Sequence, residues 1–282
     1  MADPMIFKTS IVQSLSSIAM SASSAPQSEV DIPNQGDVIG LNFELTQSTT
    51  GTLTGANTLD FSIENISVKD KFGNPIWQNV RGRDLNEIEG LTSFYVNGKG
   101  IFTSVATTSG SSQTRRYHVP FRIDRAMFPC KIQITVAPFG SMATSGATGG
   151  TVSLRVDAVY KDESANNTTD RILRLSQAIV SGTNRFGPNL PKGRVISHMA
   201  VQAGTESNVS KITFSRDGSF EISDFTSAVW TALDQDLFHS GHQSGLINLY
   251  NSPYVASEQS ILDVEGAGSD TLQWFIFLSE TA

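Results

Sequence analysis

Apolar and polar residues alternate with a period of two along much of this chain. Leu41, Phe43 and Leu45 are separated by polar residues, and the apolar residues from Tyr117 to Ile123 have the same spacing. Successive side chains of a strand point to opposite faces, so this period predicts antiparallel strands with one buried and one solvated face. The pattern recurs at residues 61–64, 66–68, 132–136, 152–160 and 195–201, and the nearly all-apolar residues 272–278 predict a last strand that is covered on both faces.

One order of elements occurs twice, about 145 residues apart. Each time, the sequence predicts a strand, a tight turn, a second strand and a short helix. In the second helix, Phe225, Val229 and Leu233, with the neighbouring Trp230 and Leu237, are expected to pin the helix to the sheet. The repeat indicates two similar β domains in tandem. Its first copy comprises residues 66–70, 71–75, 76–77 and 83–90, and its second comprises residues 211–215, 216–219, 220–222 and 224–233.

The repeat and the strand pattern together predict the fold class. We expect an all-β protein made of two tandem antiparallel jelly-roll β-sandwiches (a double jelly roll), each with one short helix, because two packed antiparallel sheets with long crossing connections describe a jelly roll. The predicted divisions are an N-terminal amphipathic arm and linker at 1–36, a first jelly roll at 37–165 and a second jelly roll at 166–282. Domains of ~100–150 residues are typical, so the length suits this division.

The N-terminal segment shows a different period. Phe7, Ile11, Leu15 and Ile18 are spaced four, four and three residues apart, which is the spacing of one face of a helix. We predict an amphipathic helix that docks on a partner or on a bilayer face. A secretory signal and a disordered arm are the alternatives; polar residues interrupt the apolar core that a signal would need.

Composition excludes several classes of function. The net charge is −7 and the sequence pI is about 5.1, so the chain lacks the clustered Lys and Arg that grip a phosphate backbone, and we expect no direct, sequence-specific nucleic acid binding. Cys130 is the only cysteine, which rules out an intrachain disulfide and a cysteine-based metal site. We predict that Cys130 is a small buried hydrophobic residue.

Candidate catalytic chemistry is sparse. Asp236, His239 and His242, with Asp234 nearby, carry the atoms of a metal site, but Ser240-Gly241 breaks the helix between the two histidines, and a solvated helix end is favoured. We predict His118 and His198 on outward strand faces, neither of them catalytic. No nucleophile elbow or phosphate loop occurs. We therefore predict a structural or binding protein without enzymatic activity and without cofactors. The loop with Asp162 and Glu163 could hold a structural Ca²⁺, although no spacing singles out a site.

The order of elements resembles that of double jelly-roll major capsid proteins of icosahedral, lipid-containing bacteriophages, with corticovirus-like and finnlakevirus-like capsid proteins as the most similar kinds. The resemblance covers residues 37–282 and is architectural, because no residue in it does chemistry. The long loops in the first half of this chain differ from those of the most compact members of the family. Two local patterns carry it: residues 63–77 running into 84–88, and residues 190–201 followed by 209–218 and a helix.

The resemblance implies a function in assembly. Three chains with two jelly rolls each would form a trimeric, pseudo-hexagonal capsomer, and capsomers would tile the icosahedral shell of a virion. The implied partners are further copies of the chain, an inner viral membrane, and minor capsid or vertex proteins. Phe7, Ile11, Leu15 and Ile18 would then contact the membrane or neighbouring capsomers.

Two other functions remain open at this stage. A carbohydrate-binding or adhesive β-sandwich module, such as a virion spike, would need a shallow aromatic platform. Tyr250, Tyr254 and Trp274 are available for one, but we predict them in the core. A β-sandwich hydrolase would have to use the Asp and His residues between 234 and 242.

Overall fold

The computed structural model describes residues 7–12, 18–19, 25–50, 63–97, 112–137, 149–161, 168–186, 190–216, 219–237, 242–249, 253–257 and 260–281. They form two compact units, the first ending at Thr169 and the second running from Asp170 to Thr281. The predicted boundary, between residues 165 and 166, lies four residues before this division.

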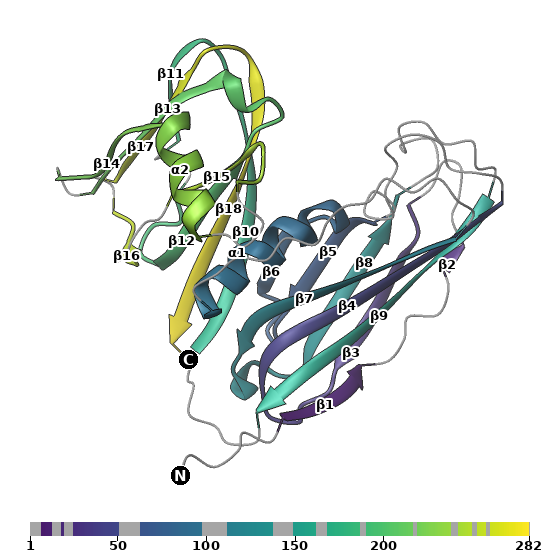
Figure 1. Ribbon diagram of the computed structural model, residues 1–282. Helices are drawn as coiled ribbons and strands as arrows, with labels where there is room; N and C mark the ends of the chain where they lie inside the picture. Colours follow the sequence, from purple (N-terminus) through teal and green to yellow (C-terminus); the bar gives the residue numbers. More distant parts are fainter. Residues whose placement is uncertain are drawn as a thin grey trace. The chain divides into compact units, whose positions relative to one another are not determined.

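The first unit consists of two antiparallel sheets (Figure 1). One sheet has the order β1-β9-β4-β7, with the short β2 beside β9, and the other has the order β6-β5-β8-β3. The helix α1, Leu85–Asn97, follows β6 after a 3₁₀ turn at Gly82–Asp84. The strands are β1 Phe7–Val12, β2 Ile18–Ala19, β3 Gln27–Ile32, β4 Asp37–Thr50, β5 Ile63–Lys69, β6 Pro75–Val80, β7 Ser112–Ile123, β8 Cys130–Val136 and β9 Gly149–Lys161.

The second unit also has two antiparallel sheets. Within it the strands are ordered β15-β12-β18-β10, with the short β16 beside β12, and β11-β17-β13-β14. The helix α2, Ser227–Leu237, follows β14. The strands are β10 Thr168–Ile179, β11 Gly182–Arg185, β12 Val195–Gln202, β13 Val209–Arg216, β14 Ser219–Thr226, β15 Leu246–Asn248, β16 Tyr254–Val255, β17 Ile261–Gly266 and β18 Asp270–Thr281.

The two units have the same topology. With β2 and β16 set aside, the described strands of each unit can be numbered in chain order from first to eighth. In both units one sheet joins the first, eighth, third and sixth strands, the other joins the second, seventh, fourth and fifth, and the helix lies between the fifth and the sixth. Two four-stranded sheets connected in this way form a jelly roll. The predicted fold class, with one short helix in each jelly roll, is therefore confirmed.

The internal repeat seen in the sequence is the fourth strand, the fifth strand and the helix of each jelly roll. It corresponds to β5, β6 and α1 in the first and to β13, β14 and α2 in the second. The carboxylate of Asp70 fixes the first hairpin, because its Oδ1 accepts the N–H groups of Phe72 at 2.9 Å and Asn74 at 2.8 Å. Gly73 adopts a φ of 83°, which favours glycine at this turn.

Each unit has its own aromatic core. In the first, the ring of Trp77 lies between those of Phe43 and Phe121, with centroids 5.4 Å from each. In the second, the rings of Phe186 and Trp274 stack at 4.3 Å. The apolar side chains of β18 from Leu272 to Leu278 are buried on both faces of the strand, as the sequence predicted.

The N-terminal segment is not a helix, so that prediction is wrong. Residues 7–12 form β1, which pairs with β9 from Phe7 opposite Lys161 to Val12 opposite Val156, and residues 18–19 form β2. β3 pairs with β8, so it too belongs to the first jelly roll and not to a separate arm or linker. The residues Phe7, Thr9 and Ile11 also satisfy a period of two, and pairing with a long strand decides between the two patterns. Leu15 lies outside the described residues.

The orientation predicted for the second helix is also wrong at two positions. Val229 and Leu233 are 42% and 37% exposed, whereas Trp230 and Asp234 face inward. Trp230, and Phe225 at the end of β14, are buried, as predicted, and the side chain of Leu237 lies outside the described residues. Neither described helix is long and apolar enough to cross a membrane.

Candidate functional site

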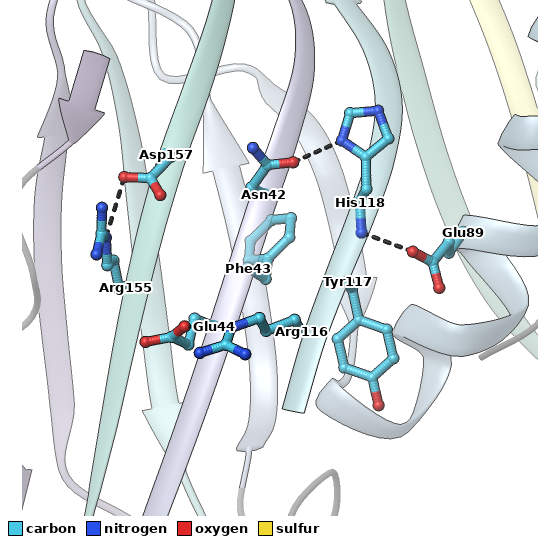
Figure 2. A pocket seen from close by; sticks show the side chains of 9 residues that line it. All are labelled: Asn42, Phe43, Glu44, Glu89, Arg116, Tyr117, His118, Arg155 and Asp157. Atoms are coloured by element: carbon cyan, nitrogen blue, oxygen red, sulfur yellow. Dashed lines mark hydrogen bonds and ion pairs between the residues drawn. The ribbon is translucent and has the colours of Figure 1, made fainter. Parts of the chain in front are cut away.

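The outer face of the sheet formed by β4, β7 and β9 carries a hollow of about 380 Å³ (Figure 2). We call this surface the polar face and define it by six outward residues: Asn42, Glu44, Arg116, His118, Arg155 and Asp157. Phe43, Tyr117 and Glu89 complete the lining of the hollow.

The strand register places the polar face in two rows. Asp157, Asn42 and His118 are aligned across the three strands, and the next row has Arg155, Glu44 and Arg116. The alternation of each strand puts both rows on the same side of the sheet. The phenyl ring of Phe43 and the phenol of Tyr117 point to the other side and are buried there.

Most of the polar groups of this face interact with one another. Arg116 Nε donates to Glu44 Oε2 at 2.5 Å, and Arg155 Nε donates to Asp157 Oδ1 at 3.2 Å. His118 Nδ1 lies 2.5 Å from Asn42 Oδ1. Exposed ion pairs of this kind contribute little stability, ~0–1 kcal/mol each. Within each of the two ion pairs the opposite charges cancel.

The cationic ends of these pairs extend further into solvent than the carboxylates. The Arg116 side chain is 76% exposed against 32% for Glu44, and that of Arg155 is 42% exposed against 18% for Asp157. An approaching partner would therefore meet guanidinium groups before carboxylates.

A carboxylate from α1 covers the edge of β7. The buried Glu89 accepts the backbone N–H of His118 at 2.6 Å through its Oε1. β7 is the last strand of its sheet, so this N–H has no strand partner on that side, and an unsatisfied edge group would be a pairing site for another chain. Glu89 thus both caps the edge and closes one wall of the hollow, as Figure 2 shows.

A second polar cluster lies where α2 ends in the second jelly roll. His242 Nδ1 is 2.7 Å from Asp234 Oδ2, and His242 Nε2 is 3.0 Å from Glu206 Oε2. Glu206 also accepts the indole N–H of Trp230 at 2.7 Å and the N–H of Gly245 at 2.9 Å. The prediction of a solvated helix end is wrong here, because Asp234 is buried and His242 is largely buried.

The hydrogen bonds of this cluster determine its protonation. Burial by itself lowers the pKa of His242, but the carboxylates of Glu206 and Asp234 outweigh burial and raise that pKa above 6.5. Burial raises the pKa of Glu206, but the N–H of Gly245, the Trp230 indole and His242 together lower it. The cluster is thus built to hold an ionised pair at the base of α2.

Neither cluster has the arrangement of a metal centre. Among the described residues, no three His, Cys, Asp or Glu side chains are grouped so that they could hold a metal ion. Asp236, which the sequence offered as a ligand, is exposed, and His239 lies outside the described residues, as do Asp162 and Glu163 of the loop considered for Ca²⁺.

Known structures resemble this chain along its whole length. No protein-family model and no curated protein matches the sequence. The STIV MCP superposes with a TM-score of 0.70 at 12% identity, covering 98% of this chain and 97% of that chain. The major capsid protein P2 of bacteriophage PM2 gives 0.63 at 10% identity, covering 98% of both chains. PBCV-1 VP54, fitted into a reconstruction of the virophage Sputnik, gives 0.60 at 10% identity, covering 99% and 95%.

Each of these single proteins superposes on both units of this chain, and this decides the architecture. This is the double jelly-roll fold. Its structural neighbours are double jelly-roll major capsid proteins, and the likeness extends over the first and the second jelly roll together. At 10–12% identity, what this chain shares with them is the fold.

The fold also shows where the remaining residues named in the sequence predictions lie. Cys130 is buried, as predicted, in the first jelly roll. Tyr254 and Trp274 are buried in the core of the second, so they form no aromatic platform, and Tyr250 lies outside the described residues. His118 is exposed, as predicted, but His198 is fully buried in the double jelly-roll fold, so its outward placement was wrong.

Sequence reasoning missed the residues that hold these clusters together. Glu89 binds His118, 29 residues away, and Glu206 binds His242, 36 residues away. No local sequence pattern reveals partners at such distances. The residues of the polar face could be recognised in the sequence as the polar positions of three alternating strands. Which strands are neighbours is a property of the jelly-roll topology and not of any one strand.

Proposed function

We propose that this protein is the major capsid protein of an icosahedral virus and that its mechanism is self-assembly into the virion shell. The observation that carries the proposal is the whole-chain likeness to the STIV MCP and to the major capsid protein P2 of bacteriophage PM2. A likeness to one jelly roll would fit many β proteins. Two jelly rolls in the same order over nearly the whole of both chains is a much narrower match.

The capsomer in this proposal is a homotrimer. Two jelly rolls of identical topology in one chain become six similar wedges when three chains close around an axis. Such a unit has a pseudo-hexagonal outline and tiles a shell by repeated contacts between copies of one chain.

The proposal includes further partners. The N-terminal segment with Phe7, Ile11, Leu15 and Ile18 contacts neighbouring capsomers or an inner membrane, and minor capsid or vertex proteins complete the particle. Since residues 7–12 are a strand, such a contact would be made beside the β1 edge and not by an amphipathic helix.

We also propose that the chain has no enzymatic activity and needs no cofactor for its fold. The whole-chain likeness to structural proteins of virus shells supports this. A structural Ca²⁺ between subunits stays part of the proposal. A melting temperature that EDTA does not change would count against it.

Light scattering of the purified protein tests the proposal. We expect a stable species of three chains of 30.4 kDa each, and electron microscopy should then show pseudo-hexagonal particles. A protein that stays monomeric at high concentration and forms no assemblies would contradict the capsid function.

A further inference from the structure

The turn between β5 and β6 presents an aromatic side chain to solvent. Phe72 is 72% exposed, which is the highest exposure of any large apolar side chain among the described residues. The residues beside it in the turn, Lys71, Gly73 and Asn74, are exposed as well. The ring therefore stands at the tip of the hairpin and takes no part in the core of the first jelly roll.

The β5–β6 turn lies at one end of the first jelly roll together with two other short connections. The register pairs Ile32 with Cys130 and Lys69 with Lys131, so β3 and β5 end level with the start of β8. We call this end the closed end. It is defined by the connections that follow β3, β5 and β7, which are residues 33–36, 70–74 and 124–129.

The closed end turns apolar groups and cations outward. Its exposed charged residues are Lys71 and Arg125. Its two carboxylates, Asp70 and Asp124, are buried and accept backbone N–H groups of their own turns. The formal charges of the three connections thus sum to zero, and net charge favours no particular partner. Besides Phe72, the apolar residues that reach the surface are the exposed Pro33, Ala126 and Pro129 and the half-buried Met127.

The Phe72 ring is carried on a turn that hydrogen bonds hold in one conformation. The N–H groups of Phe72 and Asn74 both donate to Asp70 Oδ1, and that of Gly73 donates to the Asp70 carbonyl at 2.9 Å. The N–H of Lys71 donates to the carbonyl of Met127 at 2.9 Å, which ties the turn to the connection after β7. A group fixed in this way loses little conformational freedom when it binds.

The second jelly roll makes the equivalent connection without an aromatic residue. Between β13 and β14 the sequence is Asp217-Gly218. The topology that both jelly rolls share therefore does not require a phenylalanine at this place. An exposed phenylalanine lowers solubility and adds nothing to a core, so its position at the tip of a fixed turn favours a role in contact.

We propose that the closed end of the first jelly roll docks on a lipid bilayer and that the Phe72 ring enters the interfacial region of that bilayer. This inference rests on the proposed function, since it names the residues that touch the inner membrane of the virion. The ammonium group of Lys71 lies 4.9 Å from the centroid of the ring. With the ring inserted, Lys71 and Arg125 stay at the level of the lipid phosphates, as long cationic side chains do at a membrane surface.

The size of the closed end favours a bilayer over a protein as the occupant. A stable protein interface takes ~20–30 residues and ~800 Å² from each partner, and the three connections together contain fewer residues than that. Phe72 is the only large exposed apolar side chain among them, and one phenylalanine buries ~150–250 Å². A bilayer accepts a single inserted ring, because the polar groups around the ring remain in contact with headgroups and water.

The symmetry of the proposed trimer adds to this argument. A three-fold axis places the three copies of any atom in one plane perpendicular to the axis. Three Phe72 rings can therefore meet a flat surface at the same time. Insertion of the first ring raises the effective concentration of the other two at that surface, so a contact that is weak in one chain becomes strong in the trimer.

Flotation with phosphatidylcholine vesicles tests the inference on the purified protein. We expect Phe72→Ala to lower the fraction bound at least roughly tenfold, because the transfer of a phenylalanine side chain out of water is lost. Binding of the wild type should persist in high salt, since the ring and not net charge drives it. Val180→Ala is the matched control, because Val180 is 60% exposed in the second jelly roll, and it should bind like the wild type.

Fluorescence gives a second measurement that reports on the ring itself. The native Trp77, Trp230 and Trp274 are fully buried, so vesicles should leave their emission unchanged. The emission of Phe72→Trp should shift to the blue when vesicles are added, whereas that of Val180→Trp should not. Both variants change exposed positions, and their melting temperatures should equal that of the wild type.

The outcomes separate this inference from the proposed function. Equal vesicle binding by the wild type and Phe72→Ala, or no binding by the wild type, would overturn the inference, and a trimer in light scattering would still support the capsid function. A protein that never associates would contradict the capsid function, while the Phe72→Trp emission would still decide the lipid contact. Binding that survives Phe72→Ala but is lost with Phe7→Ser and Ile11→Ser would assign the lipid contact to β1 and overturn the inference.

Discussion

His242 Nδ1 lies 2.7 Å from Asp234 Oδ2, so the segment that follows α2 is fastened to the last turn of that helix. Through its other ring nitrogen the same imidazole reaches Glu206, which precedes β13. Three segments of the second jelly roll therefore meet at one histidine. The carboxylates on both sides mean that the protonated ring is the form that binds best.

We expect the stability of the second jelly roll to depend on pH through His242. Because the carboxylates raise its pKa in the folded state, its contribution is fully present below pH ~6.5, the pKa of an unfolded histidine, and is lost as pH rises through the higher folded-state pKa. His242→Gln should therefore cost about 1–3 kcal/mol at pH 5.5 and clearly less at pH 8.5, measured by urea unfolding.

Ser244→Ala is the control for this experiment, since Ser244 is an exposed neighbour without a titratable group. It should have the same small effect at both pH values. An equal loss for His242→Gln at pH 5.5 and pH 8.5 would show that packing, and not the ionised pair, is what the imidazole contributes.

Glu89 should stabilise the edge of β7 through the N–H of His118. Glu89→Ala removes the acceptor and leaves a backbone donor without its partner, which we expect to cost about 1–3 kcal/mol. Glu89→Gln keeps an acceptor oxygen and should cost less. Hydrogen exchange of the His118 amide gives the direct measurement: it should speed up in the Ala variant. An unchanged exchange rate would mean that Glu89 does not protect this edge.

The repeated hairpins and the fold class could be predicted because their signals are local. Six consecutive residues determine the turn at Asp70 and Gly73. Each strand shows its own alternation of apolar and polar residues. Cys130 and Trp274 were placed in the core on hydrophobicity alone, and both are buried. A strand with alternating apolar and polar residues buries its apolar face whichever strand it pairs with. The local pattern therefore agrees with the final fold.

What could not be predicted depends on partners far along the chain. Phe7 and Ile11 fit a helix by spacing, yet β1 forms because β9, some 150 residues later, supplies its hydrogen bonds. In the same way, the inward position of Asp234 follows from His242, which binds it and turns that side of α2 inward, whereas the burial of Trp230 was predicted from its hydrophobicity. The apolar Val229 and Leu233 are consequently left outside, against the ordinary rule for an amphipathic helix.

Gly266 should be intolerant of any side chain. A Cβ at this position would lie 2.2 Å from the carbonyl oxygen of Val180, and the backbone on both sides would have to move. We expect Gly266→Ala to destabilise the second jelly roll by about 1–3 kcal/mol or more. Ala267→Ser, one residue along and exposed, is the control and should be nearly neutral. Thermal unfolding of the two variants would decide, and equal melting temperatures would contradict the close approach of β17 to residue 180.

Removal of residues 1–12 should damage the fold as well as any contact these residues make. β1 pairs with β9 from Val156 to Lys161, so its loss would uncover a strand edge, and uncovered edges promote aggregation. We expect the truncated chain to aggregate or to unfold at a lower temperature. A soluble truncated chain with wild-type unfolding would show that β1 is dispensable for the first jelly roll.

Substitution can separate the fold from the proposed contact of the N-terminal segment. Phe7→Ser with Ile11→Ser keeps the backbone pairing of β1 and removes the two apolar side chains. If these residues contact an inner membrane or neighbouring capsomers, the double variant should form trimers of normal stability that recruit less lipid, or that assemble into fewer particles. Ser10→Ala, on the other face of the same strand, serves as the control. Particles with wild-type yield and lipid content would rule out Phe7 and Ile11 as contact residues, while β1 would keep its place in the first jelly roll.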